Sequence, residues 1–415
     1  DPTVSPTGLI TMSGASSGDT VTISATDSNK GLATVKITAY DNTDKTIAHK
    51  GSAIVTINVR TFVDGNYLVK TNGETFVLGD EINPNIFVGS SGDSYTIPTT
   101  SGNITVAQSE IMYLSLQSCD SSISDISSGE FSKGFLAFCS HLIYLDISGL
   151  NNITGIGYAF LRGCSSLKSV DLSPLSKIIR IPSAFCYDCT SLEYIDLSPL
   201  TNVTQIGQQV LYNTNSLKGI NFNGLSKLSR IDNDFCKIIS GNANLKSVDM
   251  SFCTKVSLIE AGFFNGQKSL VNIKLPYMVQ NSQISSYFLS RCTSLESIDL
   301  TPLSNITSIG SAFMYGCSNL KSIDLSCLTK LPKTSHWFLI NCNNLTTINI
   351  GNLSADIFEK SATAYTGASF SIEDKTGDAW SIGVTLNGND TEIASLIEKF
   401  PKSTSSSPYR NWTNA

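Results

Sequence analysis

Apolar residues return at a fixed interval along most of this chain. Between about residues 111 and 353 one leucine recurs every 25 residues, and a single step of 28 residues separates Leu217 from Leu245. The anchor leucines are Leu142, Leu167, Leu192, Leu217, Leu245, Leu270, Leu295, Leu320 and Leu345. Self-similarity at this period is typical of repeat architectures, in which stacked units bury one continuous core. The sequence therefore predicts a solenoid of nine regular units after a degenerate first one, with one three-residue insertion.

An alternation of apolar and polar residues follows each anchor leucine at fixed offsets. Residues 170–172, 195–197, 298–300 and 323–325 are examples, each with Asp between two apolar residues. Alternation of this kind predicts a short strand with one buried face. Because equivalent strands would stack in register, we expect a parallel sheet along one side of the solenoid.

An aromatic residue precedes most anchor leucines by seven positions, counted without the insertion, and Val210 is the exception. The aromatic residues are Phe135, Phe160, Phe185, Phe235, Phe263, Phe288, Phe313 and Phe338. In the complete units a cysteine or small polar residue follows after four positions and the leucine after seven, which is the spacing of one helical face. We therefore expect short helical turns opposite the sheet, with Ser311 as the N-cap of one of them.

Two dipeptides mark the corners of each predicted coil. A Pro-Leu pair follows the strand, as at Pro174, and an Ile-Gly step comes later, as at Ile206. Proline fixes a bend that makes no ladder bond, and glycine allows a tight turn. Each coil thus has its corners specified.

Segments such as residues 309–325, IGSAFMYGCSNLKSIDL, combine all these features. They resemble the BspA-like leucine-rich repeats of bacterial, protist and phage-associated surface proteins. The resemblance covers about residues 111–353 and implies a leucine-rich-repeat solenoid with a parallel β-sheet on one face and short helical turns on the other. It also implies a scaffold for adhesion or binding with varied ligands, and the family has no common catalytic residue to carry over.

Residues 1–60 differ from the repeats and are expected to form an all-β, Ig-like module. Residues 21–25 and 33–39 alternate as strands. The stretch resembles the second half of a bacterial Ig-like domain of the Big_2 type, and a small β domain complete in itself is the alternative. Because the first half of such a domain is missing, we expect the chain to be the C-terminal part of a longer protein.

Two further segments flank the predicted array. Residues 61–110 are rich in short β-type runs and are expected to form a linker or N-terminal cap, since the last coil of a solenoid would otherwise expose its core. Residues 354–415 are expected to form an αβ C-terminal cap and tail. Their pattern predicts a strand over residues 380–386 and a helix from Ile393 to Phe400 that ends at Pro401.

The charge of the chain excludes several classes of partner. Only 15% of the residues are charged, the formal net charge is -6, and lysine and arginine form no cluster. The sequence therefore offers no electrostatic footprint for nucleic acid or for an anionic membrane. No apolar run reaches the roughly 18 residues of a membrane span, so we expect no span in this chain.

Eleven cysteines raise the question of disulfides or metal binding. Six share the position three before the anchor leucine: Cys139, Cys164, Cys189, Cys292, Cys317 and Cys342, with Thr214, Asn242 and Gln267 in the other units. A stacking position explains this column, because free cysteine packs as a small hydrophobe. Neighbouring thiols would lie about 5 Å apart, so reach alone does not exclude pairing, although strain within the stack argues against it.

Metal and catalytic sites find little support in the sequence. The C-x-x-C at residues 186–189 lacks the second pair of a zinc site and the thioredoxin-like setting of a redox site. Only His49, His141 and His336 occur, and the last two lie almost eight coils apart, so no catalytic triad can gather around either. No P-loop, dinucleotide fingerprint or H-E-x-x-H motif is present. A catalytic pair of carboxylates in the N-terminal region is the one alternative that the sequence leaves open. We expect no cofactor, no metal and no enzymatic activity.

The outward residue of each predicted strand is acidic in most units. This Asp column consists of Asp146, Asp171, Asp196, Asn221, Asp249, Lys274, Asp299, Asp324 and Asn349. One interpretation is an acidic groove that binds a cation, a basic peptide or a hydroxyl-rich glycan. The other is that the repeat consensus keeps a solvent-exposed Asp here, which makes the sheet soluble and resists edge-to-edge aggregation. Lys168, Lys218, Lys246 and Lys321 lie on the same face and are expected to offset some of the charge.

Two tyrosines beside the Asp column favour ligand contact, because amphipathic rings suit recognition. The candidate ligand-binding face comprises Tyr144, Asp146, Lys168, Asp171, Tyr194, Asp196, Asp249, Asp299, Lys321 and Asp324. Eight N-x-S/T sequons, including Asn152, Asn202 and Asn305, are ascribed to a repeat corner that prefers asparagine.

Together these patterns predict an extracytoplasmic adhesion or receptor-binding protein, extracellular or at the cell surface. Its expected partner is a protein or glycan on another cell or particle, recognised through the solenoid surface. The alternative is a virion-associated structural or host-attachment module of a phage or other assembly, in which the solenoid packs against sister chains. An enzyme is the least favoured interpretation.

Overall fold

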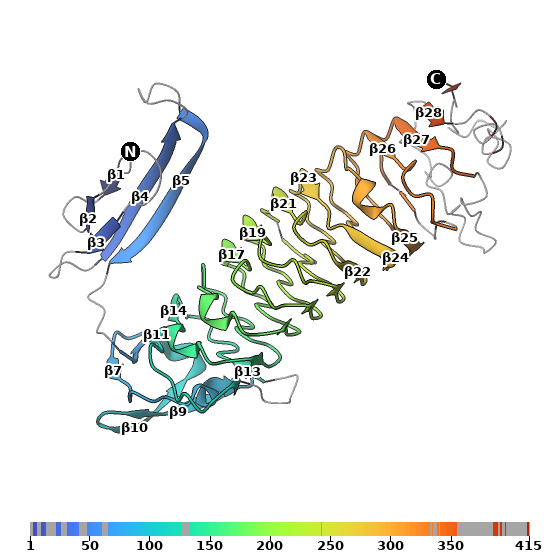
Figure 1. Cartoon of the computed structure of the whole chain (residues 1–415). Coiled ribbons are helices and arrows are strands. Elements are labelled where there is room, and N and C mark those ends of the chain that lie inside the picture. Colours follow the sequence, from blue (N-terminus) through green and yellow to red (C-terminus); the bar gives the residue numbers. More distant parts are fainter. Residues whose placement is uncertain are drawn as a thin grey trace. The chain divides into compact units, whose positions relative to one another are not determined.

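The computed structural model divides the chain into two compact units, residues 1–64 and residues 65–415 (Figure 1). In the first unit it describes the main chain of five strands. In the second it describes residues 65–126, 133–241, 243–332, 334, 338–339 and 341–354, with residues 385–388, 391, 395 and 413–414 beyond them.

The first unit is built from antiparallel strands. They are β1 (Thr3–Ser5), β2 (Ile10–Ser13), β3 (Thr22–Ala25), β4 (Gly31–Tyr40) and β5 (Ala48–Val59). Strand β4 pairs with β1 and β5, and β2 pairs with β3. Strands β3 and β4 overlap the two predicted strands, whereas the Ig-like assignment stays a prediction.

The array begins with a small β cap. Its elements are β6 (Tyr67–Lys70), β7 (Thr75–Val77), η1 (Pro84–Phe87), β8 (Val88–Gly89), β9 (Ser94–Thr99), β10 (Gly102–Ala107), η2 (Gln108–Glu110) and β11 (Ile111–Ser115). Strand β11 pairs in parallel with β14 (Tyr144–Asp146) of the first regular unit, and β6 pairs antiparallel with β11. Phe87 of the cap is fully buried against Phe135, with ring centroids 6.3 Å apart, so the cap covers the first coil.

The predicted repeat positions stack in one continuous core. All nine anchor leucines are buried in the same hydrophobic cluster. The phenylalanine rings also stack from coil to coil, with centroids 5.2 Å apart in the pairs Phe263–Phe288, Phe288–Phe313 and Phe313–Phe338. Residues at the same repeat position therefore occupy equivalent places in successive coils, as the sequence predicts.

A parallel sheet, here called the front sheet, follows the anchor leucines and confirms the predicted strands. Besides β11 and β14 it contains β17 (Tyr194–Asp196), β19 (Gly219–Asn221), β21 (Ser247–Asp249), β23 (Asn272–Lys274), β26 (Ser322–Asp324) and β27 (Thr347–Gly351). In the regular units the pairing register equals the repeat, as in Ile195 opposite Ile220. The ladders are short and interrupted, since residues 169–171 and 297–299 are not assigned to strands.

A second parallel sheet, the back sheet, was not predicted. Its order is β16 (Arg180–Ile181), β18 (Gln205–Ile206), β20 (Arg230–Ile231), β22 (Val256–Ile259), β24 (Met278–Ile284) and β25 (Ile306–Ile309). In the units before it, β12 (Asp125–Ile126) pairs in parallel with β15 (Gly155–Ile156). Strands that contain the Ile-Gly isoleucines, which were interpreted as corners, thus form the longest ladder. Apart from β24 these strands have only two to four residues, which leaves almost no alternation to detect in the sequence.

The prediction of short helical turns opposite the front sheet is wrong. Residues 184–188 instead form turns in which Ala184, Cys186 and Asp188 have φ values of 58°, 51° and 56°. The main-chain N–H of Ala184 donates to Gln208 O of the next coil at 2.7 Å, and that of Cys186 donates to Phe160 O of the preceding coil at 2.9 Å. Because alternate N–H groups bond to the two neighbouring coils, this turn ridge resembles an inner strand of a sheet more than a helix.

Ser311 therefore has no helix to cap. Its main-chain carbonyl accepts a hydrogen bond from Tyr287 N of the preceding coil at 2.8 Å. Short 3-10 helices occur at the corners after the front sheet, in η3 (Ser148–Leu150), η4 (Ser173–Leu175) and η5 (Thr301–Leu303). Two of these contain the predicted Pro-Leu pair.

At the far end, β28 (Thr385–Gly388) pairs in parallel with β27 and with β29 (Thr413–Asn414). Strand β28 overlaps the end of the predicted strand over residues 380–386. Of the predicted helix from Ile393 to Phe400 the structure describes Ser395 alone, which is helical, and the rest lies outside the described residues. No helix in the described part of the chain is long and apolar enough to cross a membrane.

Candidate binding surface

Each carboxylate of the Asp column caps the turn that follows its own strand. Its Oδ1 atom accepts a hydrogen bond from the main-chain N–H two residues later. The bonds are Asp146–Ser148 at 2.8 Å, Asp171–Ser173 at 2.9 Å, Asp196–Ser198 at 2.9 Å, Asp249–Ser251 at 3.0 Å, Asp299–Thr301 at 2.9 Å and Asp324–Ser326 at 2.8 Å. This is the local bond that favours Asp and Asn in turns.

The exceptions in the column support the same explanation. Asn221 and Asn349 have an acceptor oxygen and make the same bond, at 3.1 and 3.0 Å. Lys274 has none, and the residue two positions later is Pro276, which has no N–H to be capped. The residue type in the column therefore follows the needs of the turn, which favours the structural interpretation over an acidic groove.

Three of the four lysines beside the column pair with glutamates and not with the Asp column. Lys168 and Lys218 contact Glu193 from the two neighbouring coils, at 3.7 and 2.5 Å, and Lys321 contacts Glu296 at 2.6 Å. The hydrogen bond from Lys218 holds the pKa of Glu193 below its usual range. Within the part of the chain that the structure describes, only Lys274, itself in the column, contacts one of its carboxylates, so these three lysines do not offset the Asp column by direct pairing.

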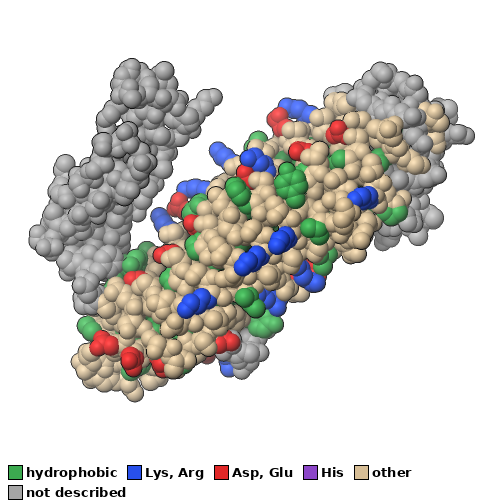
Figure 2. Space-filling model, in the orientation of Figure 1, with side chains coloured by type: hydrophobic (Ala, Val, Ile, Leu, Met, Phe, Trp, Pro, Cys, Tyr) green, Lys and Arg blue, Asp and Glu red, His purple; other side chains and the backbone are tan. Residues whose placement is uncertain are grey.

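Glu193 and Glu296 escaped the sequence analysis, although both occupy the repeat position of the lysines. Within the column, Lys274 Nζ lies 2.7 Å from Asp249 Oδ2. Figure 2 shows the result as acidic and basic side chains that alternate along the edge where Figure 1 places β14 to β23. Exposed pairs of this kind contribute only about 0–1 kcal/mol each. Among the ion pairs of the described residues only Asp249 represents the six carboxylates of the Asp column, so this edge keeps an excess of negative charge.

The two predicted tyrosines have different surroundings. The ring of Tyr194 is 48% exposed and lies over Gly219, where an added Cβ would come within 3.1 Å of Tyr194 Cδ2. Tyr144 is half-buried and packs against Tyr113, with ring centroids 6.4 Å apart. Tyr194 therefore presents a ring face on the sheet, whereas Tyr144 is part of a local cluster.

Two further aromatic side chains project from the adjoining corner and were missed from the sequence. Phe252 and Tyr277 stand in the repeat position of Pro174, Pro199 and Pro302, and are 48% and 53% exposed. Tyr277 N donates to Cys253 O at 3.1 Å, so their main chains are neighbours. The sequence did contain a signal for these two side chains, because a large aromatic residue replaces the corner proline in two consecutive units.

The cysteine column is a structural ladder, as the sequence predicts. All eleven cysteines are free. The thiols of Cys164, Cys189 and Cys317 donate to main-chain carbonyls 28 residues earlier, at 3.1, 3.0 and 3.2 Å. Burial raises the pKa of the Cys139 thiol to about 12, so that thiol stays protonated.

The insertion changes this ladder locally. Gln267 replaces cysteine in the unit after the insertion, and its Nε2 donates to Cys236 O at 2.7 Å. The longer amide side chain thus supplies the bond that a thiol makes elsewhere. Cys186 and Cys189 of the C-x-x-C are both fully buried, and burial raises the pKa of Cys186 well above its usual range.

One cluster of charged side chains lies on the back sheet. Asp232 has only 5% of its side chain exposed and accepts from Arg180 at 3.3 Å, from Arg230 at 2.6 Å and from Gln205 at 2.9 Å. Its charge is fully paired, which is how buried carboxylates are normally stabilised. No group of three or more His, Cys, Asp or Glu side chains within the described ranges is placed to hold a metal ion.

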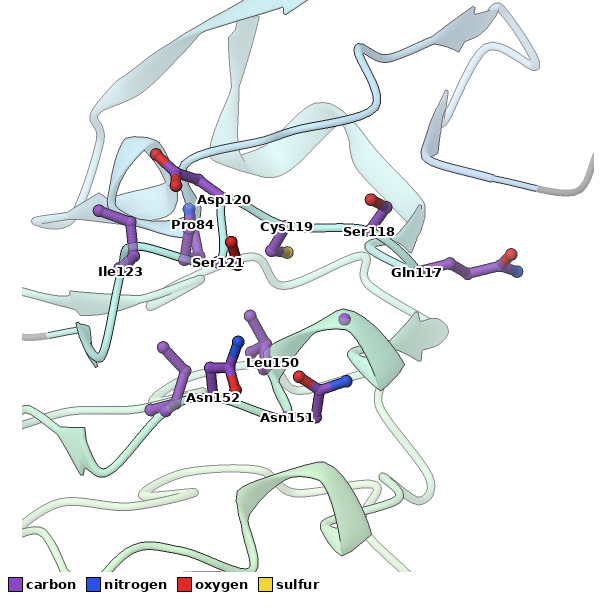
Figure 3. Close-up of a pocket in the computed structure, with 12 residues that line it drawn as sticks. Pro84, Gln117, Ser118, Cys119, Asp120, Ser121, Ile123, Leu150, Asn151 and Asn152 are labelled. Atoms are coloured by element: carbon purple, nitrogen blue, oxygen red, sulfur yellow. The ribbon is translucent and has the colours of Figure 1, made fainter.

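A polar hollow lies between the cap and the first corner of the array. It has a volume of about 230 Å³ and lies between residues 117–123 of the cap and residues 149–153 of the corner, with Pro84 beside them. Figure 3 shows the two segments facing each other, with Leu150 and Asn152 projecting from the corner towards the cap. This hollow was not predicted from the sequence.

Comparison with known proteins finds a family that matches the repeat region of the chain. The family described as BspA type leucine rich repeat region matches residues 118–240 and 237–366, which is more than half of the chain. The chain belongs to this family. No curated protein matches it.

Two solved structures are similar to the chain. A leucine-rich repeat protein from Bacteroides ovatus has 15% identity and a TM-score of 0.26, over 69% of this chain and 94% of that one. A leucine rich cell surface protein from Faecalibacterium prausnitzii has 13% identity and a TM-score of 0.33, over 81% of this chain and 97% of that one.

Proposed function

We propose that this protein is an extracytoplasmic adhesion or receptor-binding protein that recognises a glycan or protein on another cell. Membership in the BspA-type family supports the proposal, because such proteins are often adhesins of the cell surface. The proposed contact surface is the front sheet with its adjoining corner. It involves no covalent chemistry.

The observation that carries the proposal is the set of exposed rings of Tyr194, Phe252 and Tyr277. Most other recurring positions have a structural reason: the leucines and phenylalanines fill the core, the cysteines bond between coils, and the Asp column caps turns. The three rings have none of these roles, and each leaves about half of its surface to solvent. Phe252 and Tyr277 stand on adjacent coils and Tyr194 lies two coils before Phe252, and exposed aromatic side chains on a rigid scaffold are typical of recognition surfaces.

The test is binding of the whole chain to intact cells and to an array of glycans and surface proteins. The variant Tyr194→Ala/Phe252→Ala/Tyr277→Ala should bind at least tenfold more weakly, because truncating a contact ring commonly costs more than 1 kcal/mol. Ile179→Ala is the matched control, since Ile179 is 65% exposed but adjoins the back sheet.

Equal losses in the ring variant and the Ile179 control would contradict the proposed surface. If the chain bound no cell or ligand but assembled into particles with sister chains on the front sheet, the structural or host-attachment role would replace adhesion.

A further inference from the structure

A row of lysines, here called the lysine row, runs along the corner between the front and back sheets. One repeat position contributes Asn152, Lys177, Asn202, Lys227, Lys255, Gln280, Asn305 and Lys330. The four lysines are exposed. They are 50, 28 and 75 residues apart, so they form no cluster in the sequence. The coils bring them onto one line of roughly 29 Å, at about 4.8 Å for each coil.

Neutral amide side chains hold the lysines in place. Lys177 Nζ donates a hydrogen bond to Asn152 Oδ1 at 3.3 Å, and Lys227 Nζ donates to Asn202 Oδ1 at 2.8 Å. Asn202 is fixed in turn, because its Nδ2 donates to Ser176 O of the preceding coil at 3.2 Å. The amide thus orients the ammonium group without neutralising its charge.

The same arrangement recurs further along the row. Lys330 Nζ donates to Asn305 Oδ1 and to Gln280 Oε1, both at 2.6 Å, and Asn305 Nδ2 donates to Met278 O at 3.0 Å. Lys255 has no side-chain partner among the described residues. Since an ammonium group has three N–H donors, every lysine of the row keeps at least one for a ligand.

The sequence around the lysine row contains no carboxylates. The ten residues after each of the first eight positions of the Asp column include neither aspartate nor glutamate. These stretches are residues 147–156, 172–181, 197–206, 222–231, 250–259, 275–284, 300–309 and 325–334. Figure 2 shows basic side chains in a line across this face, apart from the edge where acidic and basic side chains alternate.

The lysines of the row differ in this respect from those of the front sheet. Lys218, Lys274 and Lys321 each contact a carboxylate. Among the described residues the four lysines of the row form no ion pair. On the back-sheet side, Asp232 contacts Arg180 and Arg230, so its charge is already balanced. The lysine row is therefore a positive strip on a chain of net negative charge.

Short hydroxyl side chains accompany the row. They stand one position before its members and are Ser176, Thr201, Ser226, Thr254, Ser304 and Thr329. Their hydroxyl groups make no hydrogen bond with another described residue. A hydroxyl can donate to an anionic oxygen and accept from a sugar hydroxyl, so these side chains suit a ligand that carries both groups.

The surroundings of the row favour a polysaccharide over a nucleic acid. Proteins bind single-stranded nucleic acids with a charged groove and with aromatic rings on which successive bases stack. Phe252 and Tyr277 adjoin only the middle of the row, and the corner positions before Lys177 and Lys330 hold Pro174 and Cys327 instead. The ends of the row thus offer charge and hydroxyls without rings.

We propose that the lysine row binds a linear anionic polysaccharide that carries sulfate or carboxylate groups along its length. The amides that hold the ammonium groups reduce the entropy lost on contact. This site goes beyond the proposed adhesion function, because its ligand is a charged polymer and its contacts do not involve the exposed rings.

The test compares dextran sulfate with dextran, because the two polymers share a backbone and differ in charge. By biolayer interferometry at about 0.1 M salt, the whole chain should bind the sulfated polymer and not the neutral one. A polyuronate distinguishes carboxylate from sulfate as the preferred group, and binding of either polymer supports the site. Raising the salt to about 0.5 M should release the polymer, since exposed charges are then screened over shorter distances.

A row variant, Lys177→Gln/Lys227→Gln/Lys255→Gln/Lys330→Gln, should bind at least about tenfold more weakly, because it loses four ionic contacts. The matched control is Lys168→Gln/Lys218→Gln/Lys246→Gln/Lys321→Gln, which changes the net charge equally on the front sheet. It should keep its affinity within about threefold, since charges beyond about 10 Å are screened at this salt. Thermal unfolding checks that both variants fold.

Equal losses in the two variants, or equal binding of dextran and dextran sulfate, would overturn the site. Tighter binding of single-stranded DNA than of either anionic polysaccharide would assign the row to nucleic acid and overturn the polysaccharide. The variant that lacks the three exposed rings should still bind dextran sulfate, and the row variant should keep ring-dependent binding. Failure of one site therefore leaves the other standing.

Discussion

At the residue scale, several repeat positions are set by a main-chain hydrogen bond that a particular side chain completes. The Asp column is the clearest case, because Asp and Asn alternate freely in it while the lysine stands where proline removes the donor. The cysteine column follows the same logic, since Gln267 makes an equivalent bond to a carbonyl. Acceptor or donor capacity decides the residue type more than charge does.

The Asp column yields a direct stability test. Asp196→Asn should leave the free energy of unfolding almost unchanged, because the amide oxygen still accepts from Ser198 N. Asp196→Ala should cost about 1 kcal/mol, the net value of one hydrogen bond. Urea unfolding of both variants measures the difference, and equal destabilisation by Asn and Ala would argue for a role of the charge.

The buried thiols predict a loss of stability in alkali. Burial raises the pKa of Cys139 and Cys236 from 9.0 to about 12, so the folded chain keeps protons that the unfolded chain releases. Their contribution is complete below pH 9 and is lost as the pH rises towards 12.

Thermal unfolding between pH 7 and pH 10.5, under reducing conditions, measures this effect. The melting temperature should fall faster above pH 9 for the natural chain than for Cys139→Ala/Cys236→Ala. Parallel curves for the two proteins would show that other groups cause the alkaline loss.

At the element scale, the front sheet and the core could be predicted because their side chains recur at long, regular intervals and are buried on one side only. The back sheet could not, since strands as short as β18 carry no alternation. The turn ridge was mistaken for helix because its inward residues, such as Phe185, Cys189 and Leu192, happen to match a helical spacing.

The signal for the turn ridge lay in a neighbouring position. Four residues before the anchor leucine the sequence often has Gly, Asn or Asp, the residues that best tolerate positive φ. Examples are Gly163, Asp188, Asn213, Gly266, Gly316 and Asn341, all with positive φ. The polar hollow had no comparable signal, because it is lined by the corner of the degenerate first unit, whose sequence does not follow the repeat.

At one of these positions, four residues before the anchor leucine, we predict that a substitution stabilises the chain. Arg291 has φ 61°, whereas Gly266 and Gly316 occupy the same position in the adjacent units. Arg291→Gly should therefore stabilise the chain by up to about 1 kcal/mol, by removing left-handed strain.

Arg291→Ala is the control, since it removes the side chain but keeps the Cβ. Chemical unfolding should show a gain for glycine only. Equal values for the two variants would mean that the φ value carries no measurable strain.

At the scale of the whole molecule, charges along the front edge pair across coils, as Lys168, Glu193 and Lys218 do. The other five carboxylates of the Asp column take part in no such pair among the described residues, so this edge keeps a modest negative charge. The proposed contact nevertheless relies on the exposed rings, whose packing against a ligand does not depend on charge.

Binding to the cellular ligand should accordingly change little with ionic strength. Raising the salt from about 0.05 M to 0.5 M shortens the screening length roughly threefold, yet affinity should stay within a factor of about two. Surface plasmon resonance over this range measures it. A steep loss of affinity with salt would point to an ionic interface in place of the proposed one.

The equal register of every regular coil has a consequence for engineering. Since Ile195 pairs with Ile220 in the front sheet and Ile206 pairs with Ile231 in the back sheet, each 25 residues along the chain, a duplicated 25-residue block inserted between regular units would find bonding partners on both sides. Each copy should lengthen the rod by about 4.8 Å. The solenoid could thus be lengthened in steps of one 25-residue unit, with both ends left intact.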